Sequence, residues 1–341
     1  MKELIDKLET NQILSRDEFK QVLLCEDDYL FERARFSAQS VYGKNIYIRG
    51  LIEFTSYCKN NCFYCGLRIE NKTAQRYRLS KAQILECCKT GYSLGFRTFV
   101  LQGGEDCYYT DEILAEIVSE IKEKYPDCAI TLSVGERKLE SYERLFKAGA
   151  DRYLLRHETA NDGHYKALHP EKMSLSNRKE CLYNLRKIGF AVGCGFMVGS
   201  PNQTLDNIID DILFIKELKP QMAGVGPFIP HSNTPFKNEK AGDLKLTLNI
   251  MAILRLMMPN LLLPATTALG ALDSMGRELG ILAGANIVMP NLSPVEARNK
   301  YLLYDNKIST GEEAAEYLTN LQAKIEKIGY KIAVTRGDFL P

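Results

Sequence analysis

The sequence of 341 residues lacks the charge imbalance that points to a polyanionic partner. Lysines and arginines number 44 against 43 aspartates and glutamates, so the net charge is only +1. Proteins that bind nucleic acid normally carry a basic excess or a basic stripe. A small-molecule substrate is therefore the better expectation, and no nucleic-acid partner is predicted.

A signal peptide and a long apolar run are missing as well. The N-terminus alternates charged residues and has no apolar core, which predicts a cytoplasmic protein. The most apolar region, residues 244–272, is interrupted by Arg255, Pro259, Asn260 and Pro264. A membrane span needs about 20 uninterrupted apolar residues, so this region predicts buried helix and strand, and no membrane contact is expected.

Disulfides are not expected, although the chain has ten cysteines, because the cytoplasm is reducing. Most of the cysteines are scattered, and each of these is interpreted as a buried or half-exposed thiol rather than a ligand. Cys107 follows Glu105–Asp106, and its thiol is either inert or in contact with a substrate metal. The scattered cysteines are Cys25, Cys87, Cys88, Cys107, Cys128, Cys181 and Cys194.

The other three cysteines lie together in the segment T-S-Y-C-K-N-N-C-F-Y-C-G-L-R, residues 55–68. Cys58, Cys62 and Cys65 have the spacing C-x3-C-x2-C and follow an apolar run that predicts a strand. Thiolates are the ligands of iron–sulfur clusters, and a loop that wraps a compact object lets all three converge. A cubane cluster fits and would keep one iron open for a small chelating molecule. A zinc site or three buried thiols are the alternatives, but structural zinc usually has four protein ligands, and no histidine or further cysteine is nearby.

Short apolar runs alternate with longer amphipathic stretches from residue 44 onward, which is typical of repeated βα units. Eight such units predict a closed TIM-type (β/α)8 barrel over residues 46–309, with an open sheet of six or more strands as the alternative. Residues 1–45 predict a helical lead-in, in which Ser15 and Glu18 form a capping box. Residues 310–341 predict a tail whose helix, 312–328, packs on the barrel. The predicted strands are 46–54, 98–102, 129–133, 152–157, 191–197, 222–228, 261–266 and 286–289. The predicted helices include 81–94, 111–124, 139–148, 177–188, 205–216, 244–258 and 276–283.

Polar residues follow the predicted strands where a barrel would hold its site. The second strand ends in Q-G-G-E-D, and its two glycines let the backbone approach a ligand, although an ordinary glycine turn is the alternative. In the fourth, Arg152 and Arg156 share one face by the two-residue period. Two charges inside a barrel are costly unless an anion meets them, so a ligand is favoured over a structural ion pair. Thr266 and Thr267 end the seventh strand and suit an anion.

The cysteine spacing after a first strand, with Tyr64 before the last cysteine, resembles the radical S-adenosylmethionine (SAM) superfamily. Further segments resemble one family in its biotin-synthase-like group, the [FeFe]-hydrogenase maturase HydE. The matching segments run from about residue 46 to residue 304. They are I-E-F-x-x-x-C-x-x-N-C-x-Y-C-G-L-R, Y-R at 77–78, L-Q-G-G-E-D, A-G-A-D-R-Y-L-L-R-H-E-T-A-N, G-P-F-I-P-H, N-E-K-x-G-D, P-A-T-T-A and G-A-N-I-V-M-P-N.

The resemblance implies a mechanism and a set of partners. One [4Fe-4S] cluster on Cys58, Cys62 and Cys65 would bind SAM and cleave it reductively to a 5′-deoxyadenosyl radical. The radical would act on a cysteine-bound Fe(CO)2(CN) complex made by the maturase HydG, towards the diiron H-cluster. A link to HydG and HydF and a ferredoxin or flavodoxin electron donor are implied. No cysteine follows Cys194, so no second cluster is expected.

The strand ends and the resemblance together predict two sets of site residues. Those expected at SAM are Tyr64, Gln102, Gly103, Gly104, Glu105, Glu158, Arg178 and Met197. Those expected at the substrate are Arg49, Thr131, Ser133, Arg152, Arg156, Thr266, Thr267 and Tyr301.

Two other functions stay open at this point. Methylornithine synthase, an amino-acid mutase, shares the cluster loop and the barrel but resembles the chain less around R-H-E-T-A and P-F-I-P-H. A non-catalytic iron–sulfur scaffold or carrier is the third hypothesis, and the complete SAM-type site argues against it. Biotin synthase would bring further cysteines for an auxiliary cluster, and no suitable set is evident.

Overall fold

The computed structural model describes residues 1–307 and 314–341, and its parallel strands follow one another in sequence order. One sheet has the order β2-β3-β4-β5-β6-β7. Each crossover between neighbouring strands includes a helix, as repeated βα units require. The strands are β2 (Gly50–Thr55), β3 (Thr98–Gly103), β4 (Ala129–Ser133), β5 (Arg152–Leu154), β6 (Ala191–Val198) and β7 (Met222–Pro227).

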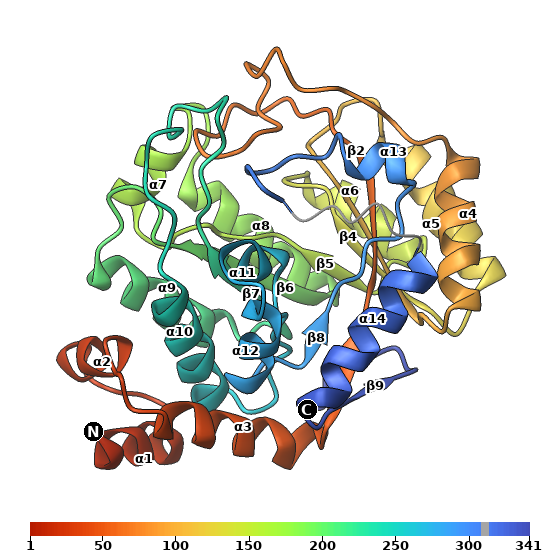
Figure 1. Ribbon diagram of the computed structural model, residues 1–341. Coiled ribbons are helices and arrows are strands. Elements are labelled where there is room, and N and C mark those ends of the chain that lie inside the picture. Colours follow the sequence, from red (N-terminus) through yellow and green to blue (C-terminus); the bar gives the residue numbers. More distant parts are fainter. Residues whose placement is uncertain (308–313) are drawn as a thin grey trace.

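A smaller sheet and the segment 261–266 close this row of strands into a ring (Figure 1). Leu262 bridges β7 at Met222, and Pro264 bridges the smaller sheet at Ile287. The smaller sheet has the order β8-β1-β9, and β1 leads directly into β2. Its strands are β8 (Ile287–Val288), β1 (Asn45–Ile48) and β9 (Lys331–Ala333). The predicted (β/α)8 barrel is thereby confirmed.

Three predicted strands differ clearly from the observed ones, two of them for identifiable reasons. Residues 261–266 form only isolated bridges, because Pro264 has no N–H for a continuous ladder. Residues 46–54 are split at Arg49, because β1 pairs with β8 and β9 while β2 pairs with β3. The strand predicted over 152–157 already ends at Leu154.

Helices cover the outside of the ring, and side-chain caps set where many of them begin. Ser80, Thr110, Ser174 and Thr204 each accept a hydrogen bond from a backbone N–H in the first helical turn, which satisfies a donor that the helix leaves open. The short helices α7, α11 and α13 were not among the predictions. The helices are α4 (Lys81–Ser93), α5 (Asp111–Lys124), α6 (Leu139–Lys147), α7 (Asp162–Leu168), α8 (Leu175–Ile188), α9 (Leu205–Leu218), α10 (Leu244–Met257), α11 (Thr267–Leu272), α12 (Gly276–Leu282) and α13 (Val295–Arg298).

Three helices precede β1, namely α1 (Lys2–Asn11), α2 (Arg16–Leu23) and α3 (Tyr29–Tyr42). They pack on α9, α10 and α12 and lie together, in red, at the lower left of Figure 1. They help to bury α10, the longest helix of the most apolar region. In the part of the chain that the structure describes, no helix has both the length and the apolar character to cross a bilayer.

The C-terminal tail contributes a strand as well as a helix. The helix α14 (Ala314–Lys327) is followed by β9, which pairs in parallel with β1. A strand from the far end of the chain therefore completes the smaller sheet. The predicted boundary between residues 309 and 310, and the predicted helix start at residue 312, lie outside the described residues.

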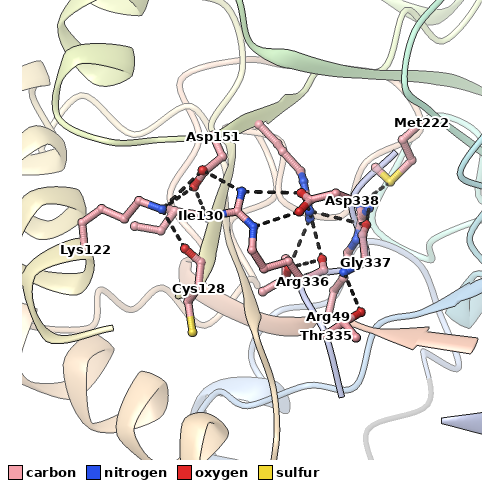
Figure 2. Close-up of polar contacts among 12 residues, drawn as sticks. Arg49, Lys122, Cys128, Ile130, Asp151, Met222, Thr335, Arg336, Gly337 and Asp338 are labelled. Atoms are coloured by element: carbon pink, nitrogen blue, oxygen red, sulfur yellow. Dashed lines mark hydrogen bonds and ion pairs between the residues drawn. The ribbon is translucent and has the colours of Figure 1, made fainter. Parts of the chain in front are cut away.

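Residues 335–339 then turn beneath the amino-terminal ends of the barrel strands (Figure 2). Arg152, the first residue of β5, donates to the Asp338 carboxylate at 2.6 Å and to the carbonyl oxygen of Arg336 at 2.9 Å. The Arg336 guanidinium lies 3.0 Å from the carboxylate of Asp151. The end of the chain thus closes the end of the barrel where the strands begin.

Asp338→Ala is expected to destabilise the fold, because it leaves the Arg152 guanidinium, only 6% exposed, without its charged partner. Such an unpaired buried group typically costs about 1–3 kcal/mol of unfolding free energy, which chemical denaturation measures. Asp162→Ala is the control, because Asp162 pairs with Lys166 on the exposed surface. Its effect should stay below about 0.5 kcal/mol. Equal effects of the two substitutions would contradict the closing role of Asp338.

Candidate active site

A cavity of about 340 Å³ opens among the carboxyl-terminal ends of the barrel strands. These ends meet at one face of a (β/α)8 barrel, so side chains from distant parts of the chain converge there. Most of the predicted site residues line this cavity: Cys58, Cys62, Tyr64, Cys65, Gln102, Gly103, Gly104, Glu105, Ser133, Arg156, Glu158, Arg178, Met197, Thr266, Thr267 and Tyr301.

The cysteine loop, residues 55–68, runs from the end of β2 along the cavity and is tied to several other loops. Such ties replace the regular hydrogen bonds that a loop lacks. These hydrogen bonds fix the positions of the three thiols. The backbone N–H groups of Lys59, Phe63 and Gly66 donate to the carbonyl oxygens of Glu105, Leu168 and Leu303 at 2.9, 3.0 and 2.8 Å.

Arg76 holds the same loop from within, and it was not among the predicted site residues. Its guanidinium donates to the carbonyl oxygens of Ser56 at 2.5 Å, Leu67 at 2.9 Å, Arg68 at 2.8 Å and Asn71 at 3.3 Å. The rigid fork of an arginine suits this task, because it offers five N–H donors in one plane. Its position next to the Y-R segment at 77–78 gave no signal of this role.

Burial raises the pKa of all three thiols, that of Cys65 to about 12. Thiols in such surroundings become thiolates when a metal binds them. Among the described residues, no group of histidine, cysteine, aspartate or glutamate side chains converges on a single metal ion. In a [4Fe-4S] cluster each thiolate binds a different iron, whereas structural zinc usually has four protein ligands. The donor set therefore fits a [4Fe-4S] cluster better than one zinc ion.

The turn after β3 packs directly against the cysteine loop. A Cβ atom at Gly104 would lie 2.2 Å from the carbonyl oxygen of Tyr57, so only glycine fits there. The neighbouring Glu105 accepts the N–H of Glu136 at 3.1 Å and lies 3.4 Å from Lys59 Nζ. The turn is thus fixed between two loops, with its polar groups beside the thiols.

Arg178, in the first turn of α8, reaches back to this part of the wall. Its Nε donates to Glu136 at 2.5 Å, and its Nη1 donates to the carbonyl oxygen of Arg156 at 3.0 Å. Glu136 thus holds Arg178 in place from outside the lining of the cavity, a contact that was not among the predictions. Its signal in the sequence is only a Gly-Glu pair after the third predicted strand.

Three donor atoms of the cavity wall have no hydrogen-bond partner among the described residues. They are Arg156 Nε, Arg156 Nη2 and Thr266 Oγ1. Arg156 Nη2 lies 3.4 Å from the carboxylate of Glu158, whereas the Thr267 hydroxyl is 2.9 Å from that of Tyr304. Donors without a partner in a cavity suit an anionic ligand, which would accept their hydrogen bonds.

An ion pair buried in the same wall was also missed. Lys307 Nζ lies 2.5 Å from Glu53, whose other oxygen accepts from Asn291 Nδ2 at 2.8 Å. The Lys307 and Glu53 side chains are only 6% and 1% exposed. In the sequence, Glu53 is one charged residue in an apolar strand, and its partner is 254 positions away.

Arg49, Thr131 and Arg152 do not line this cavity, although they were expected at the substrate. They surround a separate cavity of about 30 Å³ beside Asp338, at the end of the barrel where the strands begin. The two-residue period gives Arg152 and Arg156 a common face, but Arg156 lies four positions further along the extended chain, about 13 Å along the barrel. Arg152 meets the Asp338 carboxylate, so the structure places these three residues away from the substrate site that was expected for them.

The model of the Radical SAM superfamily matches residues 52–215, from β2 into α9. The matched region contains the cysteine loop, the glycine turn and Arg178. Together, the barrel and the thiol-lined cavity define the class of protein, a radical SAM enzyme.

Similarity over the whole chain identifies one family within the radical SAM enzymes. The chain is 42% identical to the [FeFe] hydrogenase maturase subunit HydE of Thermotoga maritima, over 97% of this chain and 95% of that protein. It is 31% identical to the 3-methylornithine synthase of Methanosarcina acetivorans, over 84% of this chain and 83% of that protein. The chain belongs to the HydE family of [FeFe]-hydrogenase maturases.

Solved structures share the fold. Methylornithine synthase (PylB) matches with a TM-score of 0.82 at 27% identity, covering 97% of both chains. The maturase HydG from Carboxydothermus hydrogenoformans matches with a TM-score of 0.82 at 23% identity, covering 98% of this chain and 79% of that one. The predicted superfamily, family and enzyme class are confirmed, whereas the roles of single residues stay predictions.

Replacing Cys58, Cys62 or Cys65 by alanine should prevent assembly of the cluster, because each thiol would bind its own iron. After anaerobic reconstitution, the variants are expected to hold less than about a quarter of the iron of the unchanged protein. Iron and sulfide analysis and the EPR signal after reduction measure this loss. Cys107→Ala is the control, because that thiol is exposed. A cysteine-loop variant with full iron content would refute its ligand role.

Proposed function

We propose that the protein acts on a cysteine-bound Fe(CO)2(CN) complex during assembly of the diiron H-cluster. The proposal rests on donors that lack a hydrogen-bond partner among the described residues, namely Arg156 Nε and Thr266 Oγ1. Both lie in the cavity that the cysteine loop borders. Buried donors of this kind are costly unless a ligand supplies acceptors. An anionic complex with carboxylate, cyanide and carbonyl groups would supply them.

The cluster and SAM, when bound, supply a 5′-deoxyadenosyl radical. Cys58, Cys62 and Cys65 would hold the cluster, with Arg76 keeping their loop in place. SAM would lie against the nearby polar residues of the wall. The residues proposed for this contact are Tyr64, Gln102, Gly103, Gly104, Glu105, Glu158, Arg178 and Met197.

The remaining part of the cavity would bind the substrate. Arg156 supplies the positive charge, and the hydroxyl groups of Ser133, Thr266, Thr267 and Tyr301 supply further polar contacts. The closure at residues 335–339 keeps water from entering through the far end. Exclusion of water protects a reactive radical from side reactions.

We also propose partners and a cytoplasmic location for the protein. HydG would supply the complex, and HydF would belong to the same assembly route. A ferredoxin or flavodoxin in the cytoplasm would supply the electron. The similarity to HydE of Thermotoga maritima supports this setting.

A radical SAM amino-acid mutase is the second candidate, and the similarity to methylornithine synthases favours it. The two functions differ in what the protein does alone. A mutase would convert added lysine into a rearranged product without any other maturase. A maturase would leave lysine unchanged.

The Arg156→Met variant tests the substrate site. Reconstituted protein is mixed anaerobically with dithionite, SAM and the synthetic Fe(CO)2(CN)–cysteine complex, and 5′-deoxyadenosyl adducts are followed by mass spectrometry and EPR. The KM for the complex is expected to rise about 10- to 100-fold, the equivalent of one lost charged hydrogen bond.

Arg144→Met is the matched control, because Arg144 is 51% exposed on α6. It should leave the KM unchanged. Formation of 5′-deoxyadenosine with no adduct in the unchanged protein would refute the proposed substrate and leave the enzyme class intact.

A further inference from the structure

A histidine and an aspartate are buried together behind the cavity wall, and the proposed function uses neither. His157 follows β5, Asp211 lies in α9, and both side chains are 0% exposed. His157 Nε2 lies 3.5 Å from Asp211 Oδ1, and the rings of Phe196 and Phe214 pack on the imidazole. Polar groups in apolar surroundings are costly unless they are bonded. The hydrogen bonds of His157 and Asp211 therefore indicate what this pair does in the fold.

The pair ties the segment 157–160 to β6 and α9, because His157 meets the backbone of Gly195 and Asp211 meets that of Ala160. The N–H of Gly195 donates to His157 Nδ1 at 3.3 Å, which leaves the proton of the neutral ring on Nε2, facing Asp211. Burial lowers the pKa of His157, in agreement with a neutral ring. Asp211 Oδ1 also accepts the N–H of Ala160, and Lys179 Nζ donates to the Ala160 carbonyl oxygen at 3.2 Å. Side chains of α8 and α9 thus hold Ala160 on both sides.

The segment held in this way contains a strained residue. Glu158 has a φ of 65°, a left-handed conformation that a residue with a side chain adopts only when its surroundings enforce it. Its N–H donates to the carbonyl oxygen of Gly195 at 3.0 Å. Its side chain lines the cavity, and its Oε2 has no hydrogen-bond partner among the described residues, with Arg156 Nη2 at 3.4 Å as an ion-pair neighbour. The backbone conformation at 158 therefore decides where this carboxylate points.

We propose that His157 and Asp211 are positioning residues that hold Glu158 in its left-handed conformation and so direct its carboxylate towards SAM. The inference rests on the proposed function, because contact between Glu158 and SAM is part of it. Neither His157 nor Asp211 lines the cavity, so their effect passes through the backbone. Loss of Asp211 frees the Ala160 N–H and lets residue 158 relax towards an ordinary extended conformation.

A double-mutant cycle on SAM affinity tests the proposal, with anaerobic calorimetric titration of the reconstituted protein. Asp211→Ala is expected to raise the Kd for SAM about tenfold, as the loss of a supporting contact typically does. In a Glu158→Ala background, the same substitution should change the Kd less than about twofold, because no carboxylate is left to direct. Asp211→Asn keeps an acceptor for Ala160 and should restore most of the affinity.

Leu218→Ala is the matched control, because Leu218 is fully buried on the same helix, about two turns from Asp211. It should lower the thermal stability and leave the Kd for SAM unchanged. A purely structural role of Asp211 would weaken binding equally in both backgrounds. That result, or an unchanged Kd in Asp211→Ala, overturns the proposal.

Amide hydrogen exchange tests the positioning role of Asp211 independently of the proposed SAM contact of Glu158. It can be measured without a bound cluster. If Glu158→Ala leaves the Kd unchanged, the SAM contact of Glu158 is wrong. Asp211→Ala should still speed exchange at residues 158 and 160 beyond the effect of Leu218→Ala, and equal exchange in the two variants overturns the positioning role. If Asp211→Ala does not fold, His157→Phe, which keeps the volume of the ring, takes its place in both measurements.

Discussion

Closure of the parallel ring is the constraint on which the rest of the structure depends. An open sheet leaves unpaired backbone groups at its edges, and here Leu262, Pro264 and β8 pair these edges although the seventh predicted strand is not continuous. Once the ring is closed, all strands end on one side. The cysteine loop, the glycine turn and Arg178 then share one cavity without being near in sequence.

The C-terminal part of the chain is fixed to both ends of this barrel by ion pairs in which at least one side chain is buried. Lys307 meets Glu53 in the cavity wall, and Asp338 meets Arg152 where the strands begin. The partners are 254 and 186 positions apart. Breaking a buried pair leaves an uncompensated charge, so each pair fixes a distant segment against the barrel. The two pairs therefore hold the cavity wall and the far end of the barrel in place.

Polar groups in the barrel fall into two kinds. Those with partners inside the protein stabilise the fold, and those without such partners are available to a ligand. Glu53 and Arg152 have partners within the protein. Arg156 Nε and Thr266 Oγ1 have none among the described residues. Glu158 is an intermediate case, because its backbone is hydrogen-bonded to Gly195 while its carboxylate has an ion-pair neighbour, Arg156, but its Oε2 accepts no hydrogen bond from the described residues. The open groups are those that a ligand would satisfy.

The sequence by itself determined what depends on neighbouring residues. Period and caps are local, so it located β4, α5 and the capping box at Ser15, and the cysteine spacing identified the superfamily. Only the tertiary structure decided the surroundings of Arg152 and Arg156, which belong to one motif and one face. Their depth in the barrel and their partners depend on residues far along the chain, among them Asp338. No local pattern encodes such contacts, because they form only when the ring closes.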